Sequence, residues 1–308
     1  MHAAQIHTWG QAPTYTSLPS PPPPTDSETI QITLLATGLH RLVRSRASGR
    51  HYTTPTLPHT PGVDGVGRTP SGEIVYFSTY QAPTGSFATV HNVAKKDILP
   101  LPTDISPIRA AALGNLAMSS WMALRLRCEN LPSDGFSVLI MGVTSASGQV
   151  AIHLARYLGA KRVVGVGRNA STLQALHLDE SIVLRETATE TDFSTLGHVD
   201  VVLDYLGGAP ATHLLQSLQP SGGRVQYVHI GGLAGTEMVL PGSVLRGKDL
   251  VIRGSGLGSF GMGDMQREMG GLFEALVGWQ EMEFRVEKLH DVERVWGEGG
   301  GDRIVFVP

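Results

Sequence analysis

Short apolar runs alternate with stretches of helical periodicity between residues 136 and 277. The apolar runs are predicted strands, at residues 138–141, 162–166, 199–203, 224–230 and 250–253. The other stretches place a hydrophobic residue every three or four positions, which predicts helices at residues 149–158, 170–176, 211–218 and 264–277. Strands that are apolar on both faces and are separated by helices indicate a parallel sheet covered by helices on each side.

The pattern differs before residue 116, where strands and loops predominate. The predicted strands are bounded by glycine and proline and lie at residues 30–35, 74–77 and 87–90. Helices are predicted at residues 108–112 and 117–127, where the pattern changes. A last strand at residues 303–307 is expected to return to the first domain. The pattern therefore predicts a β-rich domain and an α/β domain.

Composition narrows the class of protein. Of 308 residues, 41% are hydrophobic and 17% are charged, which excludes a disordered chain. The formal net charge is −3 and there is no basic stripe, so we expect no nucleic-acid partner. Neither a signal peptide nor an apolar run of about 20 residues is visible, so we expect a soluble, cytoplasmic protein with no membrane partner. The single cysteine, Cys128, excludes an intramolecular disulfide and a multi-cysteine zinc site.

The segment from Gly142 to Gly148 lies between a predicted strand and a predicted helix, where a phosphate-binding turn belongs. Gly142 permits a sharp turn, and Gly148 lets the helix pack tightly against the strand. Ser145 replaces the middle glycine of the usual pattern. An α/β turn without a cofactor is the alternative, but strand, turn, helix and second strand in register favour a dinucleotide site.

The next strand ends in Gly167, Arg168 and Asn169. An NAD-specific site usually places a carboxylate here, on the ribose hydroxyl. No carboxylate is present, and a guanidinium can bind a 2′-phosphate through two hydrogen bonds. The sequence therefore favours NADPH over NADH, with a solvated surface role for Arg168 as the alternative.

Six segments occur in an order that is specific in combination: residues 36–40, 61–67, 110–114, 142–148, 199–204 and 222–225. With them the chain resembles the medium-chain dehydrogenase/reductase superfamily, in its zinc-independent quinone oxidoreductase-like branch. The resemblance covers nearly the whole chain. It implies an α/β protein in which a GroES-like β-rich catalytic domain, residues 1–115 and 280–308, accompanies a doubly wound Rossmann NADPH-binding domain, residues 116–279. A homodimer is a further expectation from the resemblance.

The resemblance also implies an NADPH-dependent oxidoreductase that transfers a hydride to an activated C=C or C=O bond of a small molecule, such as a quinone, enone or enoyl compound. A proton donor is needed near the developing oxyanion, and the catalytic candidates are Tyr52 and His40. The alternative for each is an ordinary residue of the cleft wall, with the proton coming from solvent or from a cofactor ribose hydroxyl held by Ser119. The residues implied to line the cofactor are Ser119, Gly142, Thr144, Ser145, Ala146, Ser147, Gly148, Gly167, Arg168, Asn169, Tyr205, His229, Ile230, Gly231, Ser255, Gly256 and Leu257.

Zinc is not expected. Zinc-dependent members of the superfamily carry Cys in the place of His40, and Gly-His-Glu in the place of Gly62, Val63 and Asp64. Val63 has no ligating atom, and the structural lobe of four cysteines is absent. A trio of His40, His59 and Asp64 is the alternative metal site.

Other functions stay open. A trans-enoyl reductase of a polyketide pathway would share the fold and the cofactor. A binding protein could have kept the NADPH pocket as a redox sensor, and a non-redox enzyme could catalyse isomerisation or cyclisation. Arg44, Arg46 and Arg50 are predicted to form a solvated face, with recognition of an anionic substrate as the alternative. Cys128 is predicted to be a passive residue.

Overall fold

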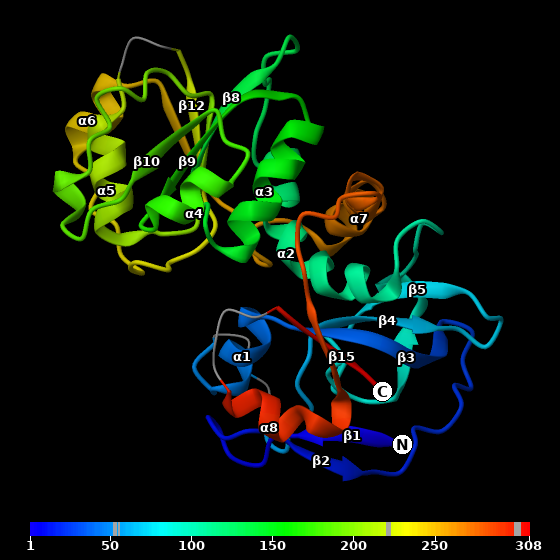
Figure 1. Ribbon diagram of the computed structural model, residues 1–308. Coiled ribbons are helices and arrows are strands. Elements are labelled where there is room, and N and C mark those ends of the chain that lie inside the picture. The colour runs from blue at the N-terminus through cyan, green and yellow to red at the C-terminus, as the bar shows by residue number, and fades with distance from the viewer. Residues whose placement is uncertain (52–53, 55, 220–222, 299–302) are drawn as a thin grey trace. The chain divides into compact units, whose positions relative to one another are not determined.

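The computed structural model describes residues 1–51, 54, 56–219, 223–298 and 303–308. These residues form two compact units, which Figure 1 shows as ribbons. The first unit comprises Met1–Asn115 and Met269–Pro308, and the second comprises Leu116–Glu268. The first unit is therefore built from both ends of the chain.

The second boundary between the units lies inside helix α7 (Met262–Leu276), and not between residues 279 and 280. The second half of this helix packs within the first unit, where Phe273 is fully buried and its ring centre lies 4.9 Å from that of Tyr76. A helix is continuous through its own hydrogen bonds, so its periodicity cannot show that its two halves are buried in different cores.

The second unit contains a six-stranded sheet in which all neighbouring strands are parallel. Its strands are β8 (Phe136–Met141), β9 (Ala160–Gly167), β10 (Glu180–Val183), β11 (Val201–Asp204), β12 (Val225–His229) and β13 (Leu250–Gly254). They lie in the order β10-β9-β8-β11-β12-β13. The strand order reverses between β8 and β11, and in such sheets ligands bind outside the carboxyl ends of the strands at this point. The sequence predicted all of these strands except β10.

Helices cover both faces of this sheet. On one face α3 (Ala146–Tyr157) and the end of α2 (Pro107–Leu126) form a core in which Ile152 lies with Ile140 of β8. On the other face α5 (Gly208–Ser217) buries Leu214 in a core with Leu139 of β8. Neighbouring residues of β8 thus serve opposite cores, as the alternation of side chains along a strand requires. The shorter helices of this unit are α4 (Ala170–Ala175), η2 (Ala188–Glu190) and α6 (Gly242–Gly247).

The first unit is built on a seven-stranded sheet. Its strands are β3 (Thr29–Leu39), β4 (Asp64–Arg68), β5 (Ile74–Ser78), β6 (Val90–Ala94), β7 (Ile98–Pro100), β14 (Arg285–Lys288) and β15 (Ile304–Val307). β15 pairs with β3, so the predicted return of the last strand to the first domain is confirmed. The remaining elements are the strand pair β1 (His2–Gln5) and β2 (Thr14–Ser17), and the helices α1 (Arg41–Ala47), η1 (Lys95–Asp97), η3 (Leu289–Asp291) and α8 (Val292–Gly297).

The two helices predicted at residues 108–112 and 117–127 are one helix, α2, of 20 residues. Gly114 lies at the predicted break. The Tyr76 ring packs so closely against this glycine that a Cβ there would lie 2.8 Å from it. This packing offsets the low helix propensity of glycine, which costs about 1 kcal/mol relative to alanine.

The strand predicted at residues 87–90 is wrong, because β6 begins at Val90. The Phe87 amide donates to the carbonyl of Pro61, and the Phe87 carbonyl accepts from the amide of Ala4, both at 2.9 Å. Phe87 therefore bonds to two separate segments. Its side chain is fully buried, so its hydrophobicity reflects packing in the core of the first unit and not pairing in the sheet.

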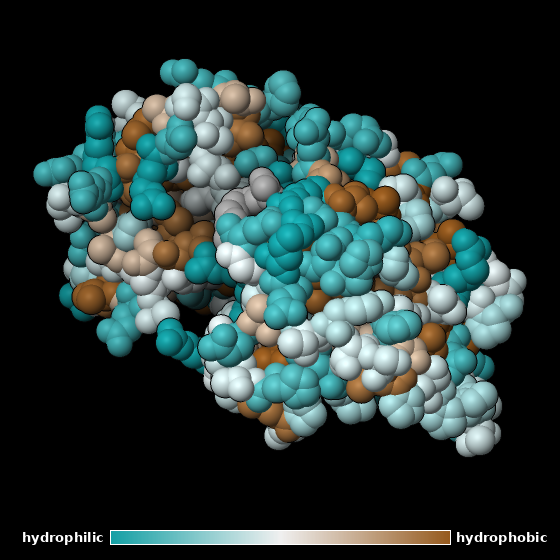
Figure 2. Space-filling view, turned by 60° about the horizontal axis from the view of Figure 1, so that its bottom comes forward, coloured by the Kyte–Doolittle hydropathy of each residue, from teal (hydrophilic) through white to brown (hydrophobic). Residues whose placement is uncertain are grey.

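The hydrophobic residues of the described chain gather in buried cores within each unit. On the face drawn in Figure 2, hydrophilic side chains lie between smaller groups of hydrophobic ones. No helix within the described ranges is both long enough and apolar enough to cross a membrane.

Candidate functional site

The turn after β8 leads directly into α3. Gly142 has a φ of 84°, in the left-handed region that glycine adopts without strain. The amides of Gly142 and Val143 both donate to the carbonyl of Val166 on β9, at 2.9 and 3.0 Å. The turn is thereby fixed to the neighbouring strand, and the positive amino end of α3 lies at the carboxyl edge of the sheet.

Ser145 stands where the usual pattern has its middle glycine, and its geometry gives the reason. Its φ is −71°, which any residue adopts, and its hydroxyl caps α3 by accepting from the Gly148 amide at 3.1 Å. Gly148 has no room for a side chain, because a Cβ would lie 2.5 Å from the carbonyl oxygen of Gly142. The close approach predicted for Gly148 is present in the backbone.

The end of β9 lies beside this turn. A Cβ at Gly167 would lie 2.8 Å from the Thr144 side chain, so the strand end and the turn are in contact. Asn169 caps α4, since its Oδ1 accepts from the amide of Thr172 at 3.1 Å. Arg168 is exposed, and within the described chain its guanidinium has no hydrogen-bond or ion-pair partner. Arg168 is therefore free to bind a ligand, whereas the Asn169 side-chain oxygen is already engaged.

A buried carboxylate joins the ends of β11 and β12. Asp204 has no exposed surface, and it accepts from the amides of Leu206 and Gly207 at 2.8 and 3.0 Å. It also accepts from the Tyr227 hydroxyl at 2.6 Å and lies 2.9 Å from Nδ1 of His229. Burial and this carboxylate raise the pKa of Tyr227, so the hydroxyl keeps its proton. Asp204 was absent from the predicted site, although an aspartate at the end of an apolar strand could have indicated it.

The predicted residues after β12 are arranged around the same aspartate. The amides of Ile230 and Gly231 donate to the Asp204 carbonyl at 2.7 and 3.1 Å. The His229 carbonyl accepts from the Ser255 amide at 2.8 Å, which joins the end of β12 to the end of β13. Because Nδ1 of His229 is bound to Asp204 and the side chain is 31% exposed, Nε2 is the nitrogen left for a ligand.

Ser119 and Tyr205 are brought together although 86 positions separate them in the chain. Ser119 lies on α2 and Tyr205 follows β11, and their hydroxyl oxygens are 3.2 Å apart. Burial raises the pKa of Tyr205 to about 12, so it is a neutral hydrogen-bonding group at physiological pH.

The predicted cofactor residues of the second unit thus gather at the carboxyl edge of its sheet. Thr144, Ala146 and Ser147 belong to the turn after β8, and Ser255, Gly256 and Leu257 directly follow β13. They meet because the carboxyl ends of parallel strands share one edge of a sheet. This edge of the second unit is the candidate cofactor site.

The first unit contains a second buried carboxylate, next to a predicted catalytic residue. Asp64 is 2% exposed, and its Oδ1 lies 3.0 Å from Nε2 of His40. Its Oδ2 accepts from the Tyr76 hydroxyl at 2.6 Å, and burial and this carboxylate raise the pKa of Tyr76. Nδ1 of His40 is buried and has no hydrogen-bond partner in the described part of the chain. The other catalytic candidate, Tyr52, lies outside the described residues.

These contacts bear on the alternative metal trio. His40 and Asp64 bind each other, while burial and the charge of Arg46 lower the pKa of His59 to about 4. Among the residues that the structure describes, no three His, Cys, Asp or Glu side chains are grouped so that they could hold a metal ion. Independence from zinc stays a prediction.

The arginines near α1 do not share one solvated face. Arg50 is exposed and Arg44 is half-buried, but Arg46 is 7% exposed. The predicted solvated face is therefore wrong for Arg46. Positions three and four apart lie on one side of a helix, and α1 buries Arg46 on the same side as Val43 and Ala47.

The lone cysteine is chemically quiet. Burial raises the pKa of Cys128 to about 12, which suppresses the thiolate that a nucleophile needs. This agrees with the passive role predicted for it.

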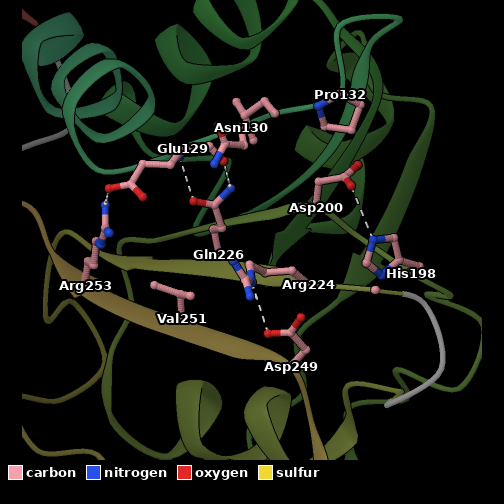
Figure 3. A pocket seen from close by; sticks show the side chains of 12 residues that line it. Glu129, Asn130, Pro132, His198, Asp200, Arg224, Gln226, Asp249, Val251 and Arg253 are labelled. Atoms are coloured by element: carbon pink, nitrogen blue, oxygen red, sulfur yellow. Dashed lines mark hydrogen bonds and ion pairs between the residues drawn. The ribbon is translucent and has the colours of Figure 1, made fainter.

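A pocket of about 300 Å³ lies at the opposite edge of the same sheet, by the amino ends of β11, β12 and β13 (Figure 3). Its charged side chains bind one another, as Arg224 does with Asp249 at 3.0 Å and Arg253 with Glu129 at 2.6 Å. Gln226 exchanges two hydrogen bonds with the backbone of Glu129, at 2.7 and 2.8 Å. Because these groups already satisfy one another, the carboxyl edge is the better candidate site.

Comparison with known proteins identifies the family. No family model matches the chain. The probable NADPH-dependent quinone reductase tdiC of Emericella nidulans is 35% identical over 359 aligned residues, which cover 100% of both proteins. The chain belongs to the medium-chain dehydrogenase/reductase superfamily, in its quinone-reductase-like branch. A stretch of 194 residues, 56% of this chain, is also 26% identical to 8% of a phenolphthiocerol/phthiocerol polyketide synthase of Mycobacterium tuberculosis.

Solved structures share the fold. Escherichia coli quinone oxidoreductase complexed with NADPH is similar with a TM-score of 0.79 at 21% identity, over 100% of both chains. A quinone oxidoreductase of Pseudomonas syringae is also similar with a TM-score of 0.79 at 21% identity, over 100% of this chain and 99% of that one. The predicted fold class, a GroES-like β-rich domain with a doubly wound Rossmann domain, is confirmed.

We expect Gly148→Ala to destabilise the second unit. The added methyl group would lie 2.5 Å from the carbonyl oxygen of Gly142 and 2.6 Å from Cα of Val143, and backbone atoms cannot rotate away as a flexible side chain can. Overpacking of this kind typically costs about 1–3 kcal/mol of unfolding free energy. Urea unfolding followed by circular dichroism measures the loss.

Gly247→Ala is the matched control, because a Cβ at this position of α6 would meet no atom within 4 Å. Its unfolding free energy should stay within about 0.5 kcal/mol of the wild type. Equal stabilities for Gly148→Ala and the wild type would contradict the close packing of the turn.

Proposed function

We propose that this chain is an NADPH-dependent oxidoreductase that uses no zinc and transfers a hydride to an activated C=C or C=O bond of a small molecule such as a quinone, an enone or an enoyl compound. The observation that carries the proposal is the turn from Gly142 to Gly148 at the carboxyl edge of the sheet, with the free Arg168 beside it. Full-length likeness to a protein named as an NADPH-dependent quinone reductase supports it. We further propose a cytoplasmic location, in keeping with the composition, and a homodimer, in keeping with the family.

The residues present fit a dinucleotide phosphate. The amino end of α3 favours an anion, and the absence of a side chain at Gly148 keeps the helix close to the strand. Arg168 would bind the 2′-phosphate. Ser119, Tyr205 and Nε2 of His229 would orient the nicotinamide end from the same edge. The bound cofactor supplies the hydride.

His40 is the proposed proton donor. In its imidazolium form Nε2–H donates to Asp64, whose carboxylate is also bound by Tyr76. Nδ1–H then has no partner in the described chain and is the proton available for the oxygen on which negative charge develops. After the transfer the ring is neutral and is still held by Asp64. Tyr52 stays as the second candidate.

A trans-enoyl reductase serving a polyketide pathway is the second candidate function. The similarity of 194 residues to part of a polyketide synthase favours it. The two functions share the cofactor and the hydride transfer and differ in the acceptor.

We expect the purified protein to oxidise NADPH when 1,4-naphthoquinone or a simple enone is supplied, and to keep this activity after exhaustive dialysis against a chelator. Loss of NADPH absorbance measures the rate, and elemental analysis measures zinc. Turnover with an enoyl thioester alone would favour the polyketide reductase. Tight NADPH binding without turnover of any acceptor would favour a sensor or a non-redox enzyme, and stoichiometric zinc with activity lost on chelation would contradict a zinc-free mechanism.

Arg168→Ala should weaken NADPH binding by about 1.5–3 kcal/mol, the typical contribution of a hydrogen bond to a charged group. NADH binding should change by less than about threefold, because NADH carries no 2′-phosphate. Calorimetric titration with both cofactors measures the difference. Arg246→Ala, which removes an exposed arginine of α6, is the control and should leave both affinities unchanged. Equal losses for NADPH and NADH in Arg168→Ala would show that Arg168 does not bind the phosphate.

His40→Ala or Tyr52→Phe should lower kcat at least about tenfold, because general acid catalysis is typically worth 10²–10⁴-fold. The affinity for NADPH should stay within about a factor of three in both variants. Steady-state kinetics and cofactor titration together separate the two effects. Turnover close to the wild-type rate in both variants would indicate that the proton comes from solvent or from the cofactor ribose.

A further inference from the structure

Arg46 is a buried arginine with no anionic partner among the described residues. It lies in α1 and is 7% exposed. Its Nε is buried without a hydrogen-bond partner, and no acceptor in the described chain takes a hydrogen bond from the rest of its guanidinium. Burial lowers the pKa of Arg46, and the Tyr80 hydroxyl is the one described ionisable group that opposes this shift, so no described carboxylate offsets the cost of burying the charge.

Two other arginines of the first unit show how a half-buried guanidinium is usually accommodated. Arg44 donates to the carbonyl of Trp296 at 2.9 Å, and Arg109 donates to the carbonyls of Trp279 and Met282. Arg46 has a cation–π contact instead, with Cζ 5.0 Å from the centre of the Tyr80 ring. A ring face attracts the charge but leaves the N–H groups at the guanidinium edge without acceptors.

Two imidazoles lie within electrostatic reach of Arg46. Burial and the charge of Arg46 lower the pKa of His51 and His59, and that of His59 falls to about 4. Both imidazoles are therefore neutral at physiological pH. The Arg46 cluster, which we define as Arg46, His51, His59 and Tyr80, thus carries one positive charge and no negative one.

A buried charge is costly unless it is paired and hydrogen-bonded. The described residues provide Arg46 with neither an anion nor an acceptor, so a ligand is the natural source of both. The two parallel N–H groups of a guanidinium match the two oxygens of a carboxylate. We propose that the Arg46 cluster binds the carboxylate, or a similar planar anionic group, of the acceptor substrate.

This inference rests on the proposed reductase function, because it assigns an anionic group to the acceptor of that reaction. His40 precedes Arg46 by six residues, and at 1.5 Å per residue of helix their backbones are about 9 Å apart. One or two aromatic rings span this distance, so one molecule can place its reacting bond near His40 and its anionic group near Arg46.

A matched pair of acceptors tests the proposal: 1,4-naphthoquinone-6-carboxylate and its neutral methyl ester. We expect the wild type to prefer the acid, as a ratio of kcat/KM values. Arg46→Gln should lower this acid-to-ester ratio about 10- to 100-fold, the equivalent of one charge-assisted hydrogen bond. Arg46→Lys should restore part of it, since it keeps the charge but loses the paired geometry.

Arg50→Gln is the control, because it removes an exposed arginine from the same stretch of chain and should leave the ratio unchanged. Thermal unfolding of each variant shows whether it is folded. A wild type without preference for the acid, or an Arg46→Gln variant that keeps the wild-type ratio while both rates fall together, would overturn the proposal and make Arg46 a packing residue.

Calorimetry with 2-naphthoate and neutral 2-naphthamide separates this proposal from the proposed function. If the wild type reduces neither quinone, the reductase function fails, but binding of 2-naphthoate that is lost in Arg46→Gln and kept in Arg50→Gln would still support the anion site. If the ester is reduced but neither the acid-to-ester ratio nor 2-naphthoate binding depends on Arg46, the anion site fails and the reductase stands.

Discussion

The buried carboxylate of Asp204 holds together the edge of the sheet on which the candidate cofactor site depends. It accepts from two backbone amides, from the Tyr227 hydroxyl and from the His229 ring, all without exposure to solvent. Without it these buried donors would be left unpaired, at a cost of about 1–3 kcal/mol each. Because β11 lies next to β8, where the strand order reverses, this network fixes the loops that face the turn after β8.

The first unit uses the same device around Asp64. In each unit a buried aspartate accepts from a tyrosine hydroxyl at 2.6 Å and binds one nitrogen of a histidine, His40 or His229. The pKa of each tyrosine, Tyr76 or Tyr227, is raised by burial and by the carboxylate, so its proton stays on the hydroxyl and the carboxylate remains the acceptor. Each arrangement fixes the orientation of an imidazole and leaves its second nitrogen for other chemistry.

Much of the second unit could be predicted from the sequence, because its signals are local. Strands buried on both faces are continuous apolar runs, and the positions of Gly142 and Gly148 follow from the backbone geometry of one short turn. Ser145 broke the expected glycine pattern, yet a capping serine with negative φ serves the same turn. The strand at residues 87–90 and the break at Gly114 were mispredicted, because contacts with distant segments override local preference there.

The sequence by itself determined the two kinds of domain, the order of strands and helices in the second unit and the turn that marks the candidate cofactor site. These follow from hydrophobic periodicity and from the backbone freedom of glycine, which act within a few residues. The tertiary structure alone decided that Asp204 reaches Tyr227 and His229, that Asp64 reaches His40 and Tyr76, and that Arg46 is buried beside Tyr80 without a described carboxylate. These pairings join residues 12–34 positions apart, and they depend on strand register and on the packing of α1, which no local pattern encodes.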